Sequence, residues 1–221
     1  MGESVVIGKI VRSESHVCYT CQVSGAGEVA VPPEPADYAF GNFVRIALRQ
    51  ESNRGVSVAN SRDAEWWAVG LIYNTVLLNP AFGLLGPRLS NDDQVALFSP
   101  DYLSERAVLV SVLLLGAMQP ANGRVVHGVP PVAAELGADV TVLEDDYLRA
   151  FHYFSDPERA VDGKYLHMGY MPHAVALGDP LLPQAMLATI ERLERIFPGN
   201  RALLSIVKRN IAWRLKVETA G

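Results

Sequence analysis

Charge and cysteine are both scarce in this sequence. Charged residues make up 19% of the 221 residues, and the formal net charge is −5. This is below the share of about a quarter that is usual in soluble domains. Hydrophobic residues reach 49%, which is enough for one sizeable core. The composition therefore excludes a disordered chain, and the modest acidic charge argues against a general attraction to nucleic acid. Two cysteines do not make a disulfide framework.

Long apolar runs are also lacking. Residues 107–118 supply about a dozen apolar positions, whereas a transmembrane helix needs roughly 18 to 20. The run at residues 66–86 is interrupted by three polar residues and by Pro80. The start of the chain has neither the basic nor the apolar region of a signal peptide. We therefore expect a cytoplasmic protein with no membrane attachment, in which both runs are buried strands.

Familiar nucleotide-binding and catalytic motifs are missing as well. The sequence contains no G-x-x-x-x-G-K-[ST], no G-x-S-x-G and no H-E-x-x-H. Gly25 to Ala30 match the dinucleotide pattern G-x-G-x-x-A, but prolines 32, 33 and 35 stand where that motif needs a helix. This glycine segment predicts a hairpin turn. We expect no cofactor, no metal and no catalytic residue.

The two cysteines stand in a C-x-x-C, the spacing of zinc knuckles and thiol redox sites. Cys18 and Cys21 lie in the strand-like run HVCYTCQV, where side chains three apart point to opposite faces of a sheet. Two sulfur atoms so placed cannot share a zinc ion, and no second cysteine pair completes a site. No helix follows to lower a thiol pKa, as redox sites require. We interpret both cysteines as small apolar strand residues.

Short β-type runs fill the first two thirds of the chain. They lie at residues 5–11, 16–23, 28–32, 42–49, 66–78, 107–118, 123–129 and 139–143, and Gly- and Pro-rich turns separate most of them. Many short strands bounded by turn formers are typical of a closed barrel or a sandwich. The sequence therefore predicts a mainly β protein with some α-helix, whose small closed barrel spans residues 1–143.

Residues 144–221 follow a helical pattern instead. A short amphipathic helix is predicted at 144–154, with its acidic residues in the first turn, where the helix dipole favours them. Further helices are expected at 182–197 and from about Asn200. In the last of them we expect an apolar stripe containing Leu203, Val207 and Ile211 to be buried, because such helices are not stable alone in water.

A loop near the start of this helical region could hold a ligand pocket or a metal. It contains His167, Tyr170 and His173, and His152 lies just before it. Asp162 and Asp179 are near in sequence, so an enzyme or small-ligand binder with a His/Asp site is one hypothesis. The simpler interpretation, which we favour, is a loop that packs its aromatic residues between barrel and helices.

The last helix carries a strip of basic residues. At 100° per residue, four of them fall within a sector of roughly 100°. They are Arg201, Lys208, Arg209 and Lys216. Direct DNA binding through this strip, weakened by salt, is a further hypothesis, although a solvated helix face is the simpler explanation.

The order of segments resembles the HAS-barrel family. This is the small β-barrel shared by HerA-type DNA translocases and by the N-terminal crown of rotary ATP synthase subunits. Residues 7–10 (IGKI), 41–44 (GNFV) and 69–72 (VGLI) stand where that family has its "IG.V", "GDYV" and "GVV" steps. The resemblance covers about residues 4–150. The motor domain that follows the barrel in the translocases has no counterpart here, so motor activity is not carried over.

The resemblance implies ring assembly and partner docking. Our leading expectation is a non-enzymatic barrel module that assembles or docks partners beside a HerA-like translocase and its nuclease in DNA processing. The partner would be one of these proteins, with a homo-oligomer as a further option. Contact with nucleic acid would be indirect or weak.

Overall fold

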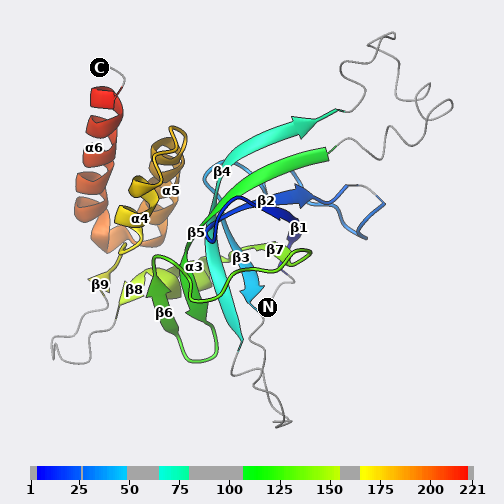
Figure 1. Ribbon diagram of the computed structural model, residues 1–221. Coiled ribbons are helices and arrows are strands. Elements are labelled where there is room, and N and C mark those ends of the chain that lie inside the picture. The colour runs from blue at the N-terminus through cyan, green and yellow to red at the C-terminus, as the bar shows by residue number, and fades with distance from the viewer. Residues whose placement is uncertain (1–3, 26, 49–64, 80–106, 155–164, 219–221) are drawn as a thin grey trace.

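A computed structural model describes residues 4–25, 27–48, 65–79, 107–154 and 165–218, and the structural statements that follow refer to these residues. The first part of the chain forms a sheet of seven strands. They are β1 (Val6–Ser13), β2 (Cys18–Val23), β3 (Phe43–Leu48), β4 (Trp66–Leu78), β5 (Ala107–Gln119), β6 (Arg124–His127) and β7 (Asp139–Val142). Figure 1 shows the last three helices of the chain, coloured yellow to red, to the left of most of these strands.

Six of the strands close into an antiparallel barrel. The hydrogen-bonded order is β2-β1-β7-β3-β4-β5, and β2 pairs back with β5 to close the ring. The seventh strand, β6, extends the sheet by pairing with the second half of β5. Closure removes most of the free strand edges that an open sheet would expose. The predicted fold class, a small closed barrel followed by a helical region, is confirmed.

Two glycines let neighbouring strands of the sheet approach closely. A Cβ on Gly8 would lie 1.8 Å from the backbone oxygen of Gln22 on the paired strand β2. On β5, a Cβ at Gly116 would lie 2.3 Å from the backbone oxygen of Val126. Any side chain at either position would require the backbone to move, so these glycines are needed for the close pairing of β1 with β2 and of β5 with β6.

The core continues from the barrel interior to its outer surface. Residues 67–73 of β4 are all buried, whereas residues 75–78 at its far end are exposed. A strand buried on both faces needs cover on its outer side, and α5 (Leu182–Ile196) packs against β4 while α4 (Met171–Ala176) packs against β5. The helical region therefore completes the core.

The helical region contains more elements than the sequence indicated. It comprises α3 (Asp145–His152), the short strands β8 (Tyr153–Phe154) and β9 (Tyr165–Leu166), α4 (Met171–Ala176), α5 (Leu182–Ile196), the 3-10 turn η2 (Pro198–Asn200) and α6 (Arg201–Glu218). The three predicted helices are confirmed as α3, α5 and α6. The helix α4 and the β8–β9 pair were missed, because each is too short to show a periodic pattern. The boundary at residue 143 stays a prediction.

One predicted strand was wrong, whereas the predicted turn beside it is present. Residues 28–32 are turn and irregular backbone rather than a strand, apart from an isolated bridge at Val29. Prolines 32, 33 and 35 cannot donate ladder hydrogen bonds, which explains the loss of the strand. The turn itself is present: the amide of Glu28 donates to the oxygen of Gly25 at 3.2 Å, and Gly27 has a φ of 95°.

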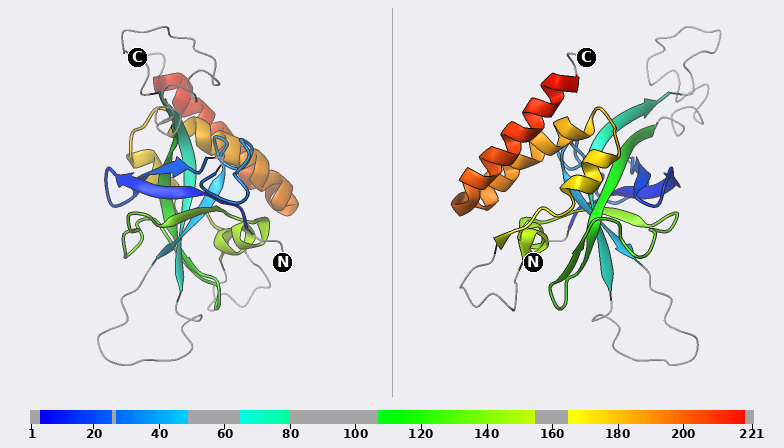
Figure 2. Two further views of the ribbon diagram at one scale, coloured as in Figure 1. Left: turned by 90° about the vertical axis from the view of Figure 1, so that its right-hand side faces the viewer. Right: turned by 60° about the vertical axis from the view of Figure 1, so that its left-hand side comes forward.

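Helix α6 is the outermost layer of the molecule (Figures 1 and 2). It packs mainly on α5, and its buried face contains Leu204 and Ile211. The expectation for Leu203 was wrong, since its side chain is 44% exposed. Val207 is only partly buried. The correct stripe lies about 100° around the helix from Leu203, through its neighbour Leu204.

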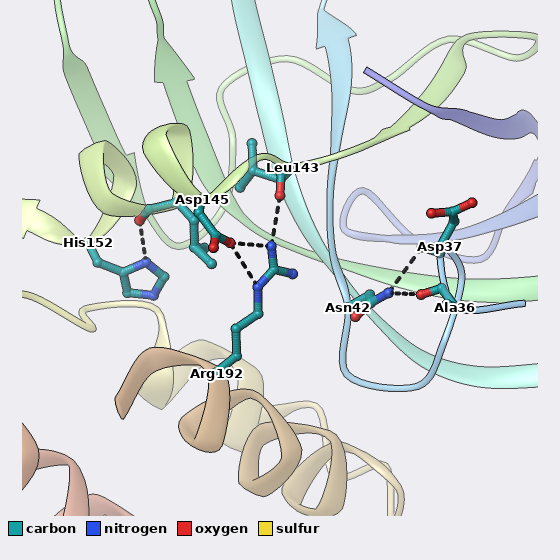
Figure 3. A network of polar contacts seen from close by, with 8 residues as sticks. Ala36, Asp37, Asn42, Leu143, Asp145, His152 and Arg192 are labelled. Carbon is teal, nitrogen blue, oxygen red and sulfur yellow. Dashed lines mark hydrogen bonds and ion pairs between the residues drawn. The ribbon is translucent and has the colours of Figure 1, made fainter. Parts of the chain in front are cut away.

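One arginine ties the helices to the end of the barrel. Arg192 of α5 donates to Asp145 Oδ1 from Nη2 at 2.6 Å and from Nε at 3.1 Å. Its Nη2 also donates to the backbone oxygen of Leu143 at 3.2 Å (Figure 3).

The described helices include none with an apolar stretch of the length that a bilayer crossing demands.

Candidate functional site

Three of the four residues predicted to line a pocket meet at the junction between barrel and helices. His152 ends α3, Tyr170 precedes α4, and His167 follows β9. The structure adds His127 of β6, which was not among the predicted pocket residues. We name these four residues the junction cluster. No sequence signal linked His127 to the others, because 25 positions separate it from His152 and only the fold brings them together.

His152 is completely buried and fully hydrogen-bonded. Its Nδ1 lies 2.9 Å from the backbone oxygen of Leu148, one turn earlier in α3, and its Nε2 lies 2.8 Å from the hydroxyl of Tyr170. A carbonyl only accepts, so Nδ1 carries the proton and Nε2 accepts from Tyr170 in the neutral ring. Burial lowers the pKa of His152 from 6.5 to about 3 and raises the pKa of Tyr170. Figure 3 shows the Nδ1 contact.

His127 is held in the opposite tautomer. Its Nε2 donates to the oxygen of Phe151 at 2.9 Å, and its Nδ1 accepts from the amide of Gly169 at 2.9 Å. Burial is the main reason that the pKa of His127 falls to about 4. The exposed ring of His167 stacks on His127 with 4.5 Å between centroids. Within the junction cluster, the buried imidazole of His152 and the half-buried imidazole of His127 are thus neutral and engaged in structural bonds.

His173 points elsewhere. From α4 its Nε2 donates to the backbone oxygen of Leu114 at 3.1 Å, next to the place where the register between β4 and β5 shifts. Asp179 lines a different cavity, and Asp162 lies outside the described residues. Hence the structure does not assemble the predicted His/Asp pocket from its described members. Among the described residues, no group of three or more His, Cys, Asp or Glu is arranged to hold a metal ion.

The cysteines are buried free thiols in β2. Burial raises the pKa of Cys21 to about 12, so its sulfur stays protonated and unreactive. Cys18 has different surroundings, since it interacts with the hydroxyl of Tyr73. This difference agrees with the expectation that the two side chains lie on opposite faces of the strand.

The basic strip on α6 is partly engaged within the chain. Lys208 forms an ion pair with Glu191 of α5 at 3.2 Å. The Nε of Arg201 donates to the backbone oxygen of Glu194 at 3.5 Å. Arg209 is exposed, and Lys216 has a contact of its own. The basic strip therefore contributes contacts between α6 and α5 as well as positive charge at the surface.

Two apolar cavities lie along the inner edge of α6. One, of about 180 Å³, lies between the α4–α5 turn and α6. The other is an open groove of about 360 Å³ between α6, α4 and β9. Val175, Ile211 and Arg214 line both, so the two are neighbours. Neither is lined by any of the histidines.

A second apolar stripe runs along the outer side of α6. Leu203, Ile206 and Trp213 are 44%, 48% and 64% exposed. Leu203 also lines the open groove, so stripe and groove form one surface, which we call the α6 surface. The sequence did contain the signal, because a helix with apolar residues over more than one stripe presents more apolar area than one neighbour covers.

Comparison with known proteins gives a family but no activity. A search of the curated proteins finds no match. A family model described as a domain of unknown function matches residues 1–220, nearly the whole chain. The chain therefore belongs to that family, DUF8166, in which the closed barrel and its helical cover form a single matched unit.

Proposed function

We propose that this protein is a non-enzymatic, cytoplasmic barrel module that docks a protein partner. The observation that carries the proposal is the α6 surface, where three large apolar side chains of one helix face solvent in the described structure. Contiguous exposed apolar side chains on a folded protein mark interaction sites. Trp213 is of the residue type most enriched among interface hot spots.

The polar residues that looked most like chemistry have structural roles instead. His127 and His152 are neutral and hydrogen-bonded to backbone or to Tyr170. The low pKa of each keeps it uncharged at neutral pH, away from the value near 7 that suits a general acid or base. This supports a docking module over an enzyme built on the His/Asp site.

Direct DNA binding has less support for a similar reason. Lys208 and Arg201 already contact α5, and Glu191 and Glu194 bring negative charge beside them. Phosphate binding would have to compete with these contacts.

We further propose that the partner is a HerA-like translocase or its accompanying nuclease, acting in DNA processing. Support comes from the segment order and from the three glycines of the resemblance. Gly8 and Gly70 both stand at close approaches between strands, since a Cβ on Gly70 would lie 2.5 Å from Val112 Cγ1. Gly41 has a φ of 86°, and its Cβ would lie 2.9 Å from the Cβ of Ala188 on α5. All three positions are thus fixed by the barrel and its cover.

Affinity purification of the full chain from its native extract tests this function. We expect a translocase or nuclease to be recovered repeatedly, and the purified mixture to form a ring-sized particle by mass measurement in solution. Repeated recovery of metabolic enzymes alone, together with a strictly monomeric protein, would overturn the proposal.

A further inference from the structure

Helix α6 has three faces with different roles. With Leu203 set at 0° and 100° per residue, the buried Ile211 and Leu204 lie at about 80° and 100°. The basic strip spans about 140° to 240°, from Lys208 to Arg209. The exposed apolar stripe of Trp213, Ile206 and Leu203 spans about 280° to 360°. One face therefore packs on α5, whereas the apolar stripe remains exposed to solvent.

The stripe continues into a concave surface. Leu203, Val207 and Asn210 belong to α6 and also line the open groove of about 360 Å³. Across the groove stand Met168 and Met171. Methionine side chains are flexible and polarizable, so they adapt to the side chains of a bound peptide. A ridge of exposed apolar residues beside a Met-lined groove is the form that receives the apolar face of a helix.

Arginines flank the stripe on both sides. Arg209 lies at about 240° and Arg214 at about 20°, so the apolar residues are between them. Both are exposed, and within the described part of the chain neither forms an ion pair. In contrast, Lys208 on the α5 side is paired with Glu191. Arg209 and Arg214 thus place uncompensated positive charge on both sides of the stripe.

The charge of the helix disfavours a second copy as the occupant. Helix α6 contains five of the 19 basic residues and one of the 24 acidic residues, so its formal charge is +4. Two copies joined through this face would bring two such helices together, and like charges across an interface are unfavourable. An acidic segment is attracted to the same face.

The rest of the chain disfavours an anionic membrane. Because the whole chain has a formal charge of −5 and α6 has +4, the remainder carries −9. A flat anionic bilayer would repel that remainder, whereas a peptide helix contacts only α6 and its groove. A concave groove also suits inserted side chains better than a plane of lipid headgroups.

We infer that the α6 surface binds an acidic amphipathic helix of a partner protein. Its apolar residues, spaced i, i+3, i+4 and i+7, contact Leu203, Ile206 and Trp213 and enter the Met-lined groove. Asp or Glu residues on its flanks pair with Arg209 and Arg214. This inference rests on the proposed docking function and names the chemistry of the partner segment.

A selection from a phage-displayed library of random peptides of about 16 residues, a length comparable to α6, tests it with the full chain as bait. The enriched sequences should be acidic and should carry apolar residues at helical spacing. A synthetic copy of an enriched peptide should become helical on binding and should shift the fluorescence of Trp213. Its affinity should fall at least about tenfold for Ile206→Asp and for the Arg209→Glu, Arg214→Glu double variant.

The matched control is Ser205→Asp, which adds the same charge on an exposed part of α6 outside the stripe. It should bind the peptide about as well as the wild type. Far-UV circular dichroism and thermal unfolding check that each variant is folded. Enrichment of basic or uncharged peptides, or equal binding by Ile206→Asp, would overturn the inference.

Two further measurements distinguish other occupants. Sedimentation of vesicles made from phosphatidylcholine and phosphatidylglycerol should not bring the protein down; co-sedimentation lost in Ile206→Asp would replace the peptide with a membrane. A concentration-dependent dimer lost in Ile206→Asp would replace it with a second copy.

If the wild type and Ile206→Asp recover the same partner from extract, the docking function stands and this inference fails. If the peptide binds but no partner is recovered from extract, this inference stands and the proposed docking function fails.

Discussion

The Nε2 of His152 lies 2.8 Å from the hydroxyl of Tyr170, and both side chains are buried where α3 meets the start of α4. The bond joins a helix beside the barrel to the segment that leads into the helical cover. Around it, the rings of Phe43, Phe151 and Phe197 exclude water from the imidazole. The hydrogen bond therefore stabilises this junction, and it requires a neutral His152 because Nε2 must accept the proton of the hydroxyl.

Lowering the pH should destabilise the protein through the junction cluster. The folded-state pKa values of His152 and His127 are about 3 and about 4, below the ordinary 6.5. The unfolded chain therefore binds more protons below about pH 6.5, and the free energy of unfolding falls as the pH drops from there toward the folded pKa values. For His152 alone the loss at about pH 5 is ~2 kcal/mol. Urea unfolding at a series of pH values measures it.

The matching control is His152→Gln, which should flatten this dependence between about pH 5 and pH 7 relative to the wild type. His16 provides the comparison, because it is exposed and lies outside the cluster, with its Nε2 2.9 Å from the oxygen of Pro130. His16→Gln should keep the steep profile. Parallel profiles for the wild type and His152→Gln would contradict the role of the cluster.

Removing the hydroxyl of Tyr170 should cost more than removing that of another tyrosine. In Tyr170→Phe the buried Nε2 of His152 loses its donor, and an unsatisfied buried acceptor costs about 1–3 kcal/mol. Tyr38→Phe is the control, because Tyr38 packs on the core without a hydrogen bond from its hydroxyl among the described residues. Chemical denaturation of both variants measures the difference. Equal loss in the two would show that the bond contributes little.

Two aspartate substitutions in α6 should separate its faces. Ile211→Asp places a carboxylate at a position that is 5% exposed and should lower the free energy of unfolding by more than about 3 kcal/mol, because the charge loses its hydration. Leu203→Asp places it on the exposed stripe and should change stability by less than about 1 kcal/mol. Thermal unfolding of both variants is the measurement. A mild Ile211→Asp would mean that α6 is not held on α5 as described.

The contacts of Arg192 should contribute more to the free energy of unfolding than an exposed ion pair does. Arg192→Ala removes two hydrogen bonds to Asp145 and one to the oxygen of Leu143, and should cost about 1–3 kcal/mol. Lys9→Ala breaks an exposed pair with Asp139 and should cost about 0–1 kcal/mol. Urea unfolding at low and high salt compares them. A larger loss in the free energy of unfolding for Lys9→Ala than for Arg192→Ala would contradict this role of Arg192.

The predicted elements came from residues whose neighbours in sequence decide their structure. Runs such as 66–78 and 107–118 are long, apolar and β-branched, and they form β4 and β5 almost to the residue. Helix α5 follows its apolar spacing, with Leu182, Ile190 and Leu193 buried. Where local signals were short or mixed, as in α4 and in residues 28–32, the prediction failed. The prolines at 32, 33 and 35 are the local signal against a strand there, because they cannot donate ladder hydrogen bonds.

The sequence by itself determined that strands come first and helices last, and it placed the turn at Gly25. Periodicity and turn chemistry act over a few residues, so they can be read without the fold. Only the tertiary structure decided which face of α6 is buried, because that depends on where α5 lies. It also brought His127 to His152 and left Leu203, Ile206 and Trp213 in solvent. Contacts between distant segments depend on barrel closure, which no local pattern encodes.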